Sequence, residues 1–343
     1  MLRFVVGTYT RLLYGVDVDL KKNTSKPIWL FEAHEKGLTA LAVDGIHLAS
    51  TSGDETIKIY DHTKNIQIAD VSVPTDVSNA CVRYMRFTKK HLLACHDNGQ
   101  ITMWSRDSWL LVHVLKSSSS KGITGIAVHP SEKLALTVGG DGKLRLWDLV
   151  RGKGSKVVGL ERAGELVDFL NDETFIVMSR TSVEAFNFNI ESLYTYKSKS
   201  QLNTMCFYKD KIAVGQGDGK ISILDASNGE LLKQLDTKQK RVKALYAACG
   251  YLVSASSDGI VKIWNDKWEC VAEHKVPEGN RVTCMVAMEA LTSAVPKPQK
   301  RVSQSESESD SESSSSESED ESAEEKTETK VKAKRANKKK RVD

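Results

Sequence analysis

Five aspartates at recurring positions are the first residues in this sequence that could do chemistry together. Carboxylates gathered on one rim of a fold can resemble an acid–base or cation site. Each of the five, however, lies in a short turn between two apolar strands, where an Asp side chain commonly stabilises the turn itself. We therefore expect a structural role for all five, on a rim that a partner could contact. They are Asp54, Asp97, Asp141, Asp218 and Asp258.

No other group of residues has the spacing of a catalytic, cofactor-binding or metal site. The segment Gly215-Gln-Gly217-Asp-Gly219 resembles a phosphate loop, but no helix follows it, and a phosphate cradle needs a helix N-terminus. The eight histidines show no paired ligand spacing. The six cysteines form no Cys-x-x-Cys pair, so we expect reduced thiols in a cytosolic or nuclear protein. The sequence predicts a protein that is not an enzyme and uses no cofactor or metal.

The aspartate turns belong to a repeat. Residues 48–61 and 252–265 align as an apolar strand, an Asp-containing turn and an alternating strand that ends in an aromatic and a polar residue. Residues 92–105, 134–148 and 211–225 follow the same pattern, with Leu224 in place of the aromatic residue in the last of them, and a degenerate copy ends at Phe186-Asn187. The closing dipeptides are 44, 43, 39, 38 and 40 residues apart. They are Tyr60-Asp61, Trp104-Ser105, Trp147-Asp148, Phe186-Asn187, Leu224-Asp225 and Trp264-Asn265.

Each repeat has room for four short strands. Residues 57–60 and 144–147 alternate with period two, as half-buried strands do. Dipeptides such as Asp141-Gly142 and Asp258-Gly259 favour tight hairpins, because such turns need a positive φ. One further strand is expected before each hairpin and one after it. Four strands in roughly 40 residues indicate the blade of a β-propeller.

These units resemble WD repeats, and the two ends of the propeller complete a seventh. Residues 4–8, 12–18 and 28–31 are three strands without a first strand, whereas residues 281–288 are a first strand with nothing after it. Pairing them closes the ring and leaves no exposed sheet edge there. The expected fold is all-β: a seven-bladed WD40 propeller over residues 1–295, closed by N- and C-terminal strands, followed by a tail over residues 296–343.

The buried hydrogen-bond network of a full WD motif is expected in one blade. That network joins the turn Asp to a His from the preceding loop and to a Ser or Thr on the strand. Only His34, Ser50 or Ser52, and Asp54 have the required positions. The other blades lack the histidine, so we expect weaker turns there, because a network with missing members loses cooperativity.

Basic residues on outward strand positions repeat in register, and two interpretations remain open. A propeller could stack them into positive arcs that suit a phosphate backbone. Alternating strands could equally place them outside for solubility. The residues are Lys58, Lys143, Arg145, Lys220 and Lys262.

Several segments of the propeller resemble the p21-activated kinase-interacting protein 1-like family. They are residues 50–61, 129–152, 241–264 and 281–284, and the resemblance extends over most of residues 1–290. It implies a non-enzymatic scaffold for assembly of the large (60S) ribosomal subunit and pre-rRNA maturation in the nucleolus. The implied partners are pre-60S ribosomal proteins and assembly factors, and rRNA. Animal members are also described as binding and restraining p21-activated protein kinase, which is the alternative function.

The tail begins with an acidic, serine-rich run. Residues 303–325 contain ten acidic and no basic residues and almost no apolar ones, so burial cannot offset the entropy of ordering them. We expect this run to be disordered. Eight serines have an acidic residue three positions later, which resembles acidophilic phosphorylation sites, although an unmodified spacer is the alternative. The serines are Ser303, Ser305, Ser307, Ser309, Ser314, Ser316, Ser318 and Ser322.

The tail ends in a basic block. Residues 326–343 contain nine Lys and Arg against two acidic residues, so the net charge of +4 for the whole chain hides two opposite runs. The block is typical of a nuclear import signal or an RNA-contacting arm, and we expect a nuclear and nucleolar protein. No apolar run approaches the roughly 18 residues of a membrane span, so no membrane partner is expected. The candidate residues are Lys332, Lys334, Arg335, Lys338, Lys339, Lys340 and Arg341.

Overall fold

The part of the chain that the structure describes consists of strands and their connections, with no helix. The computed structural model describes residues 1–73, 80–116, 122–277 and 279–290. By its contacts the chain divides into two units, Met1–Ala294 and Val295–Asp343, and all the described strands belong to the first. The tail serines and the basic block lie outside the described residues.

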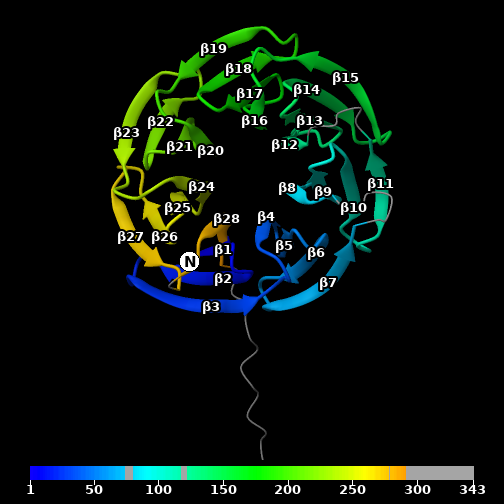
Figure 1. Cartoon of the computed structure of the whole chain (residues 1–343). Helices are drawn as coiled ribbons and strands as arrows, with labels where there is room; N and C mark the ends of the chain where they lie inside the picture. Colours follow the sequence, from blue (N-terminus) through cyan, green and yellow to red (C-terminus); the bar gives the residue numbers. More distant parts are fainter. Residues whose placement is uncertain (74–79, 117–121, 278, 291–343) are drawn as a thin grey trace, which may run out of the picture. The chain divides into compact units, whose positions relative to one another are not determined.

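The strands form seven antiparallel four-stranded sheets, or blades, arranged in a ring (Figure 1). Blade I is β4 (Leu38–Asp44), β5 (His47–Ser52), β6 (Thr56–Asp61) and β7 (Ile66–Ser72), and blade II is β8 (Val82–Phe87), β9 (His91–His96), β10 (Ile101–Ser105) and β11 (Leu111–Leu115). Blade III is β12 (Ile123–Val128), β13 (Leu134–Gly139), β14 (Lys143–Asp148) and β15 (Lys153–Gly159), and blade IV is β16 (Gly164–Phe169), β17 (Thr174–Ser179), β18 (Ser182–Asn187) and β19 (Ser192–Lys197). Blade V is β20 (Leu202–Tyr208), β21 (Lys211–Gln216), β22 (Lys220–Asp225) and β23 (Leu231–Asp236), and blade VI is β24 (Val242–Ala248), β25 (Tyr251–Ser256), β26 (Ile260–Trp264) and β27 (Cys270–Lys275). Blade VII is β28 (Val282–Glu289), β1 (Leu2–Thr8), β2 (Leu12–Asp19) and β3 (Thr24–Glu32).

Blade VII joins two distant parts of the sequence. Strand β1 pairs with β2 on one side and with β28 on the other, where Val5 lies opposite Val286. Ala290 also donates a backbone hydrogen bond to the carbonyl of Met1 at 3.0 Å. The expected seven-bladed, all-β propeller closed by its terminal strands is therefore confirmed. Closure removes the two strand edges that an open array would present.

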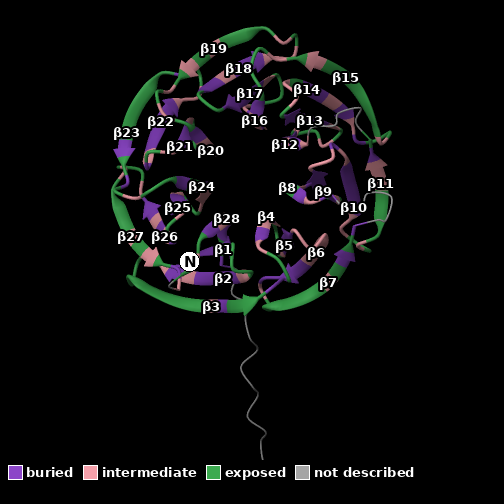
Figure 2. Ribbon diagram, viewed as in Figure 1, coloured by how far each residue is buried: buried purple, intermediate pink, exposed green. Residues whose placement is uncertain are grey.

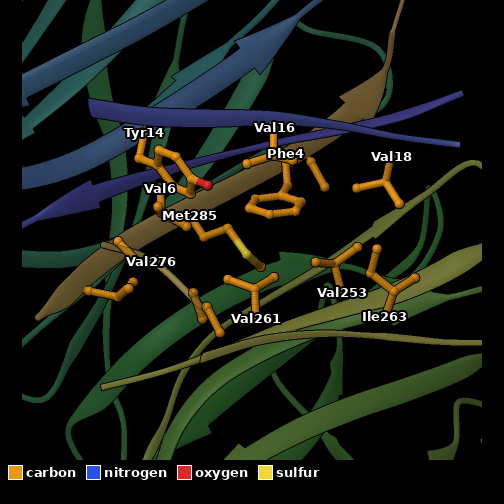
Figure 3. Close-up of a cluster of buried hydrophobic side chains, with 14 of the residues drawn as sticks. Phe4, Val6, Tyr14, Val16, Val18, Val253, Val261, Ile263, Val276 and Met285 are labelled. Carbon is orange, nitrogen blue, oxygen red and sulfur yellow. The ribbon is translucent and has the colours of Figure 1, made fainter. Parts of the chain in front are cut away.

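The hydrophobic core lies between neighbouring blades. At the junction of blades VI and VII, Phe4, Val16 and Met285 face Val261 and Ile263, and each of these side chains is buried (Figure 3). Burial decreases from the inner strands to the outermost strand of each blade, which is mostly exposed (Figure 2). Apolar residues on the inner three strands therefore drive association of the blades, since removing apolar surface from water is favourable.

Blade IV is complete despite its worn sequence. Phe186 takes the position of the tryptophan in the clearer repeats and stacks on Phe175, with ring centroids 5.6 Å apart. His129, from the β12–β13 turn of blade III, contacts Phe169 edge-on at 5.1 Å. Aromatic packing therefore stabilises this blade, in which the repeat motif is degenerate.

Candidate functional site: the mouth of the central channel

The five recurring aspartates all lie in turns between the second and third strands of a blade. The connections are β5–β6, β9–β10, β13–β14, β21–β22 and β25–β26. These turns contact the loops that lead into the same blades: Asp97 N donates to Cys81 O at 3.0 Å, and Ser257 N donates to Arg241 O at 3.0 Å. Turns and loops therefore share one side of the ring, which we call the turn face.

The hydrogen-bond network predicted around Asp54 is present in blade I. His34 contacts Asp54 through Nδ1 at 3.0 Å and Ser50 through Nε2 at 2.8 Å. Ser52 Oγ accepts from Asp54 N at 3.1 Å, and Thr56 donates to Asp54. Burial by itself would raise the pKa of Asp54, but hydrogen bonds from Thr56 and Ser52 and the neighbouring His34 outweigh it and lower this pKa to about 2. Asp54 is thus an ionised turn residue and a poor proton acceptor.

The other four aspartates have partners of their own. Asp97 is paired with Arg83 at 3.3 Å, and Asp141 with Arg145. Asp218 accepts a hydrogen bond from Ser200 at 2.8 Å and lies 3.6 Å from Lys220 Nζ, and Asp258 accepts from Ser256. All five aspartates are therefore engaged by residues of their own blade or of the loop leading into it, and Asp97 is engaged through Arg83 of β8.

Two blades without the histidine have a hydrogen bond between a tryptophan and the strand Ser or Thr. Trp147 Nε1 donates to Thr137 at 2.8 Å in blade III, and Trp264 Nε1 donates to Ser254 at 2.9 Å in blade VI. Two basic residues take over contacts on the turn face: Arg145 is 4% exposed against Asp141, and Lys262 donates to the carbonyl of Thr237 at 2.9 Å. Since Arg145 and Lys262 point into these networks, they do not form part of an outward positive arc.

The inner strands carry a feature that the sequence analysis missed. The innermost strand of every blade has a β-bulge near its start, so that one residue is skipped in the pairing with the next strand. The residue before each bulge is buried, whereas the skipped residue is partly or fully exposed. Bulges re-aim side chains and are common beside functional sites. We call the seven skipped residues the mouth ring: Thr39, Arg83, Thr124, Glu165, Asn203, Lys243 and Thr283.

Three members of the mouth ring bind the following blade. Thr39 Oγ1 donates to Val82 O at 2.7 Å, Thr124 Oγ1 donates to Gly164 O at 2.7 Å, and Asn203 Nδ2 donates to Val242 O at 3.2 Å. Each acceptor is the residue immediately before the next mouth-ring residue. Polar clamps in blades I, III and V thus fix the backbone from which the next side chain projects.

The three blades whose backbone accepts these hydrogen bonds carry the charged mouth-ring residues. They are Arg83 in blade II, Glu165 in blade IV and Lys243 in blade VI, so clamp and charge alternate around six blades. Thr283 in blade VII instead donates to Gly7 O at 3.0 Å within its own blade. The mouth therefore presents fixed charges of both signs to whatever approaches it.

Below the mouth, the channel holds an ion pair that spans three blades. Arg86 of β8 lies 3.3 Å from Asp168 of β16, and their side chains are 41% and 25% exposed because they line an open channel of about 420 Å³. Asp168 raises the pKa of Arg86, and burial raises the pKa of the neighbouring Tyr246 to about 12. At neutral pH Arg86 therefore stays protonated and Tyr246 stays neutral, so neither side chain acts as a proton donor or acceptor in catalysis.

Three thiols in the blades are held in the protonated, unreactive form by burial. Burial raises the pKa of Cys95 and Cys206 and raises that of Cys284 to about 11. A reactive cysteine needs the opposite shift, since the thiolate is the attacking species.

Among the described residues, no group of three or more His, Cys, Asp or Glu side chains could hold a metal ion. None of these residues forms a helix long and apolar enough to cross a membrane.

Comparisons with known proteins give the class and then the family. A family model described as "WD domain, G-beta repeat" matches residues 25–61 and 109–148, and one described as "Anaphase-promoting complex subunit 4 WD40 domain" matches residues 165–250. With the seven blades, these matches define a WD40 β-propeller protein. The chain is 64% identical to Shk1 kinase-binding protein 15 of Schizosaccharomyces pombe over 87% of each chain. It belongs to the p21-activated kinase-interacting protein 1-like family.

More distant relatives extend the comparison. A p21-activated protein kinase-interacting protein 1-like protein of Gallus gallus is 26% identical over 77% of this chain and 73% of its own length. Protein MAK11 of Saccharomyces cerevisiae is 24% identical over 82% of each chain. Both matches cover most of the propeller.

Proposed function

We propose that this protein is a non-enzymatic WD40 scaffold that acts in assembly of the large ribosomal subunit and pre-rRNA maturation in the nucleolus. The observation that supports this role best is the mouth ring, which holds charged side chains on clamped backbone and supplies binding surface rather than reacting groups. The recurring aspartates and the buried thiols are already committed to the fold, which fits the same role. Pre-60S ribosomal proteins, assembly factors and rRNA are the proposed partners.

The tail supports the same proposal through its composition. An acidic serine-rich run followed by a basic block is common in nucleolar proteins, and the basic block could act in import or contact RNA. Phosphorylation of the eight serines would add about −1.5 to −2 charges each and strengthen competition with RNA for the basic block.

The proposal is tested by sedimentation of the tagged full chain from nuclear extract. We expect the protein to travel with pre-60S particles in a sucrose gradient and to leave them when the mouth-ring charges Arg83, Glu165 and Lys243 are all replaced by Ser. A variant with Lys153→Ser on the outermost strand β15 is the matched control and should remain bound. Recovery of the unaltered protein only in the free fractions would contradict the proposal.

A second candidate is restraint of a p21-activated protein kinase through its regulatory region, and the names of the relatives support the kinase-binding part of it. Shk1 kinase-binding protein 15 and the kinase-interacting proteins carry a kinase in their names. Purified full chain added to such a kinase should lower its activation by a small GTPase, in proportion to the amount added. Unchanged activation at saturating protein would eliminate this candidate. The two functions can coexist, because different surfaces could serve each.

A further inference from the structure

A basic hollow of about 810 Å³ lies on the turn face where blades VII, I, II and VI meet the mouth ring. It is lined by four mouth-ring residues, Thr39, Arg83, Lys243 and Thr283, together with the turn between β1 and β2 and the loop between β3 and β4. Its size is that of a site for a few residues of an extended chain rather than a broad flat contact.

The charge of the hollow has one sign. Its lining includes the cations Arg11, Lys36, Arg83 and Lys243 and no acidic residue. Arg11 is paired with Glu32 at 3.1 Å and Arg83 with Asp97 at 3.3 Å, both at the edge of the hollow. Lys36 and Lys243 form no ion pair with the residues that the structure describes, and both are exposed. Two ammonium groups facing one concave surface favour an anionic occupant.

An exposed aromatic residue stands on rigid backbone at the rim of the hollow. Tyr9 is 72% exposed as a residue, although its backbone is held from two sides. Tyr9 N donates to Arg281 O at 2.9 Å, and a Cβ on Gly37 would lie 2.7 Å from Tyr9 O, so only glycine permits this close approach. Exposed tyrosines on a fixed backbone make effective anchors at protein interfaces, because they offer a large contact area and have only two side-chain torsions to order on binding.

We propose that this hollow, which deepens the scaffold function proposed above and rests on it, binds an acidic, Asp- or Glu-rich segment of a partner protein. Lys36 and Lys243 contact its carboxylates, and Tyr9 covers one of its side chains. A single-stranded nucleic acid fits less well, since such sites stack successive bases on several aromatic residues. Tyr9 is the one aromatic residue in the lining of this hollow.

The test uses the full chain and a fluorescent twelve-residue peptide of alternating Glu and Ser, with binding followed by anisotropy. We expect the dissociation constant to rise at least tenfold for Lys36→Glu/Lys243→Glu, and about threefold or more for Tyr9→Ala. Affinity should also fall as salt is raised. Lys153→Glu is the matched control, because Lys153 is also exposed but lies on the outer strand β15, and it should change affinity less than twofold.

A fluorescent twelve-residue oligouridylate is measured in parallel. The inference is overturned if the peptide does not bind, if Lys153→Glu weakens it as much as the double reversal, or if the oligonucleotide binds more tightly and is the ligand lost on reversal. Circular dichroism of each variant must show the unaltered spectrum, and each single lysine reversal provides a milder variant. If the peptide-binding test fails while the unaltered chain still sediments with pre-60S particles, only the binding role of the hollow is rejected. If the unaltered chain does not sediment with these particles, the proposed scaffold function is rejected.

Discussion

Arg86 in blade II donates a hydrogen bond at 3.3 Å to Asp168 in blade IV, although blade III lies between the two blades (Figure 1). Arg86 and Asp168 each lie three positions after the mouth-ring residue of their blade. The same position in blade III holds Ala127. Ala127 is fully buried in the hydrophobic cluster that blade III forms with blade IV, so its side chain does not lie between the two charged groups. The ion pair couples the innermost strands of blades II and IV across the channel.

The coupling between Arg86 and Asp168 should be measurable but small. Because Arg86 is 41% exposed, solvent screens the pair, and we expect a coupling free energy of about 1 kcal/mol or less. A double-mutant cycle with Arg86→Met and Asp168→Asn, followed by urea unfolding, would give this value. The exposed pair Lys209 and Asp266, whose N–O distance is 2.9 Å, is the control and should show no measurable coupling. Equal coupling in the two pairs would contradict the special role of the channel pair.

Replacement of His34 should destabilise blade I. His34→Ala removes contacts to Asp54 and Ser50 and leaves buried polar groups without partners, so we expect a loss of about 1–3 kcal/mol in the free energy of unfolding. The pKa of Asp54 should also rise from about 2, since His34 contributes to lowering it. Urea unfolding and NMR titration of the carboxylate would check both effects. Asp97→Asn, which disturbs a partly exposed pair, should change stability far less.

Gly7 limits how closely blades VII and I can pack. A Cβ at this position would lie 2.7 Å from Cys284 Sγ and 2.9 Å from Leu38 Cβ, so Gly7→Ala should lower stability by about 1–3 kcal/mol. Gly140→Ala is the matched control, because a Cβ there has nothing within 4 Å, and it should be neutral or slightly stabilising. Thermal unfolding of the two variants would compare them directly. Similar melting temperatures would show that the blades can shift apart at no expense in stability.

Stability should fall as the pH is lowered through about 6.5. Burial lowers the pKa of six histidines below the ordinary value of 6.5, so the unfolded chain binds more protons than the folded one below that pH. Their contribution to stability is present above about pH 6.5 and is lost as the pH falls. The pKa of Asp54, about 2 against an ordinary 3.8, adds a further loss as the pH falls from about 4 towards 2. The six histidines are His34, His47, His62, His91, His96 and His274.

Urea midpoints measured at pH 7.5, 6.0 and 5.0 in buffers of equal ionic strength would test this dependence. A His96→Gln variant should reduce the slope of stability with pH, because the neutral amide can still accept and donate hydrogen bonds in the buried site. A midpoint that rises towards pH 5 would contradict the assignment of these histidines as neutral.

The sequence by itself determined the ring and its closure. Period-two strands, Asp-Gly and Asn-Gly turns and a spacing near 40 residues are local signals, and the unmatched strands at residues 4–8 and 281–288 could only complete each other. The network of His34, Ser50 and Asp54 was also predictable, because its members have fixed places within one repeat.

The mouth ring and the channel pair were decided by tertiary structure. Thr124, Glu165 and Lys243 look like ordinary solvent-side strand residues, and only the pairing register reveals that each is skipped in a bulge of an innermost strand. Arg86 and Asp168 are 82 residues apart, and no local pattern joins them. Closure of the ring brings them within hydrogen-bond distance because a circle of blades places chemically unrelated inner strands around one narrow channel.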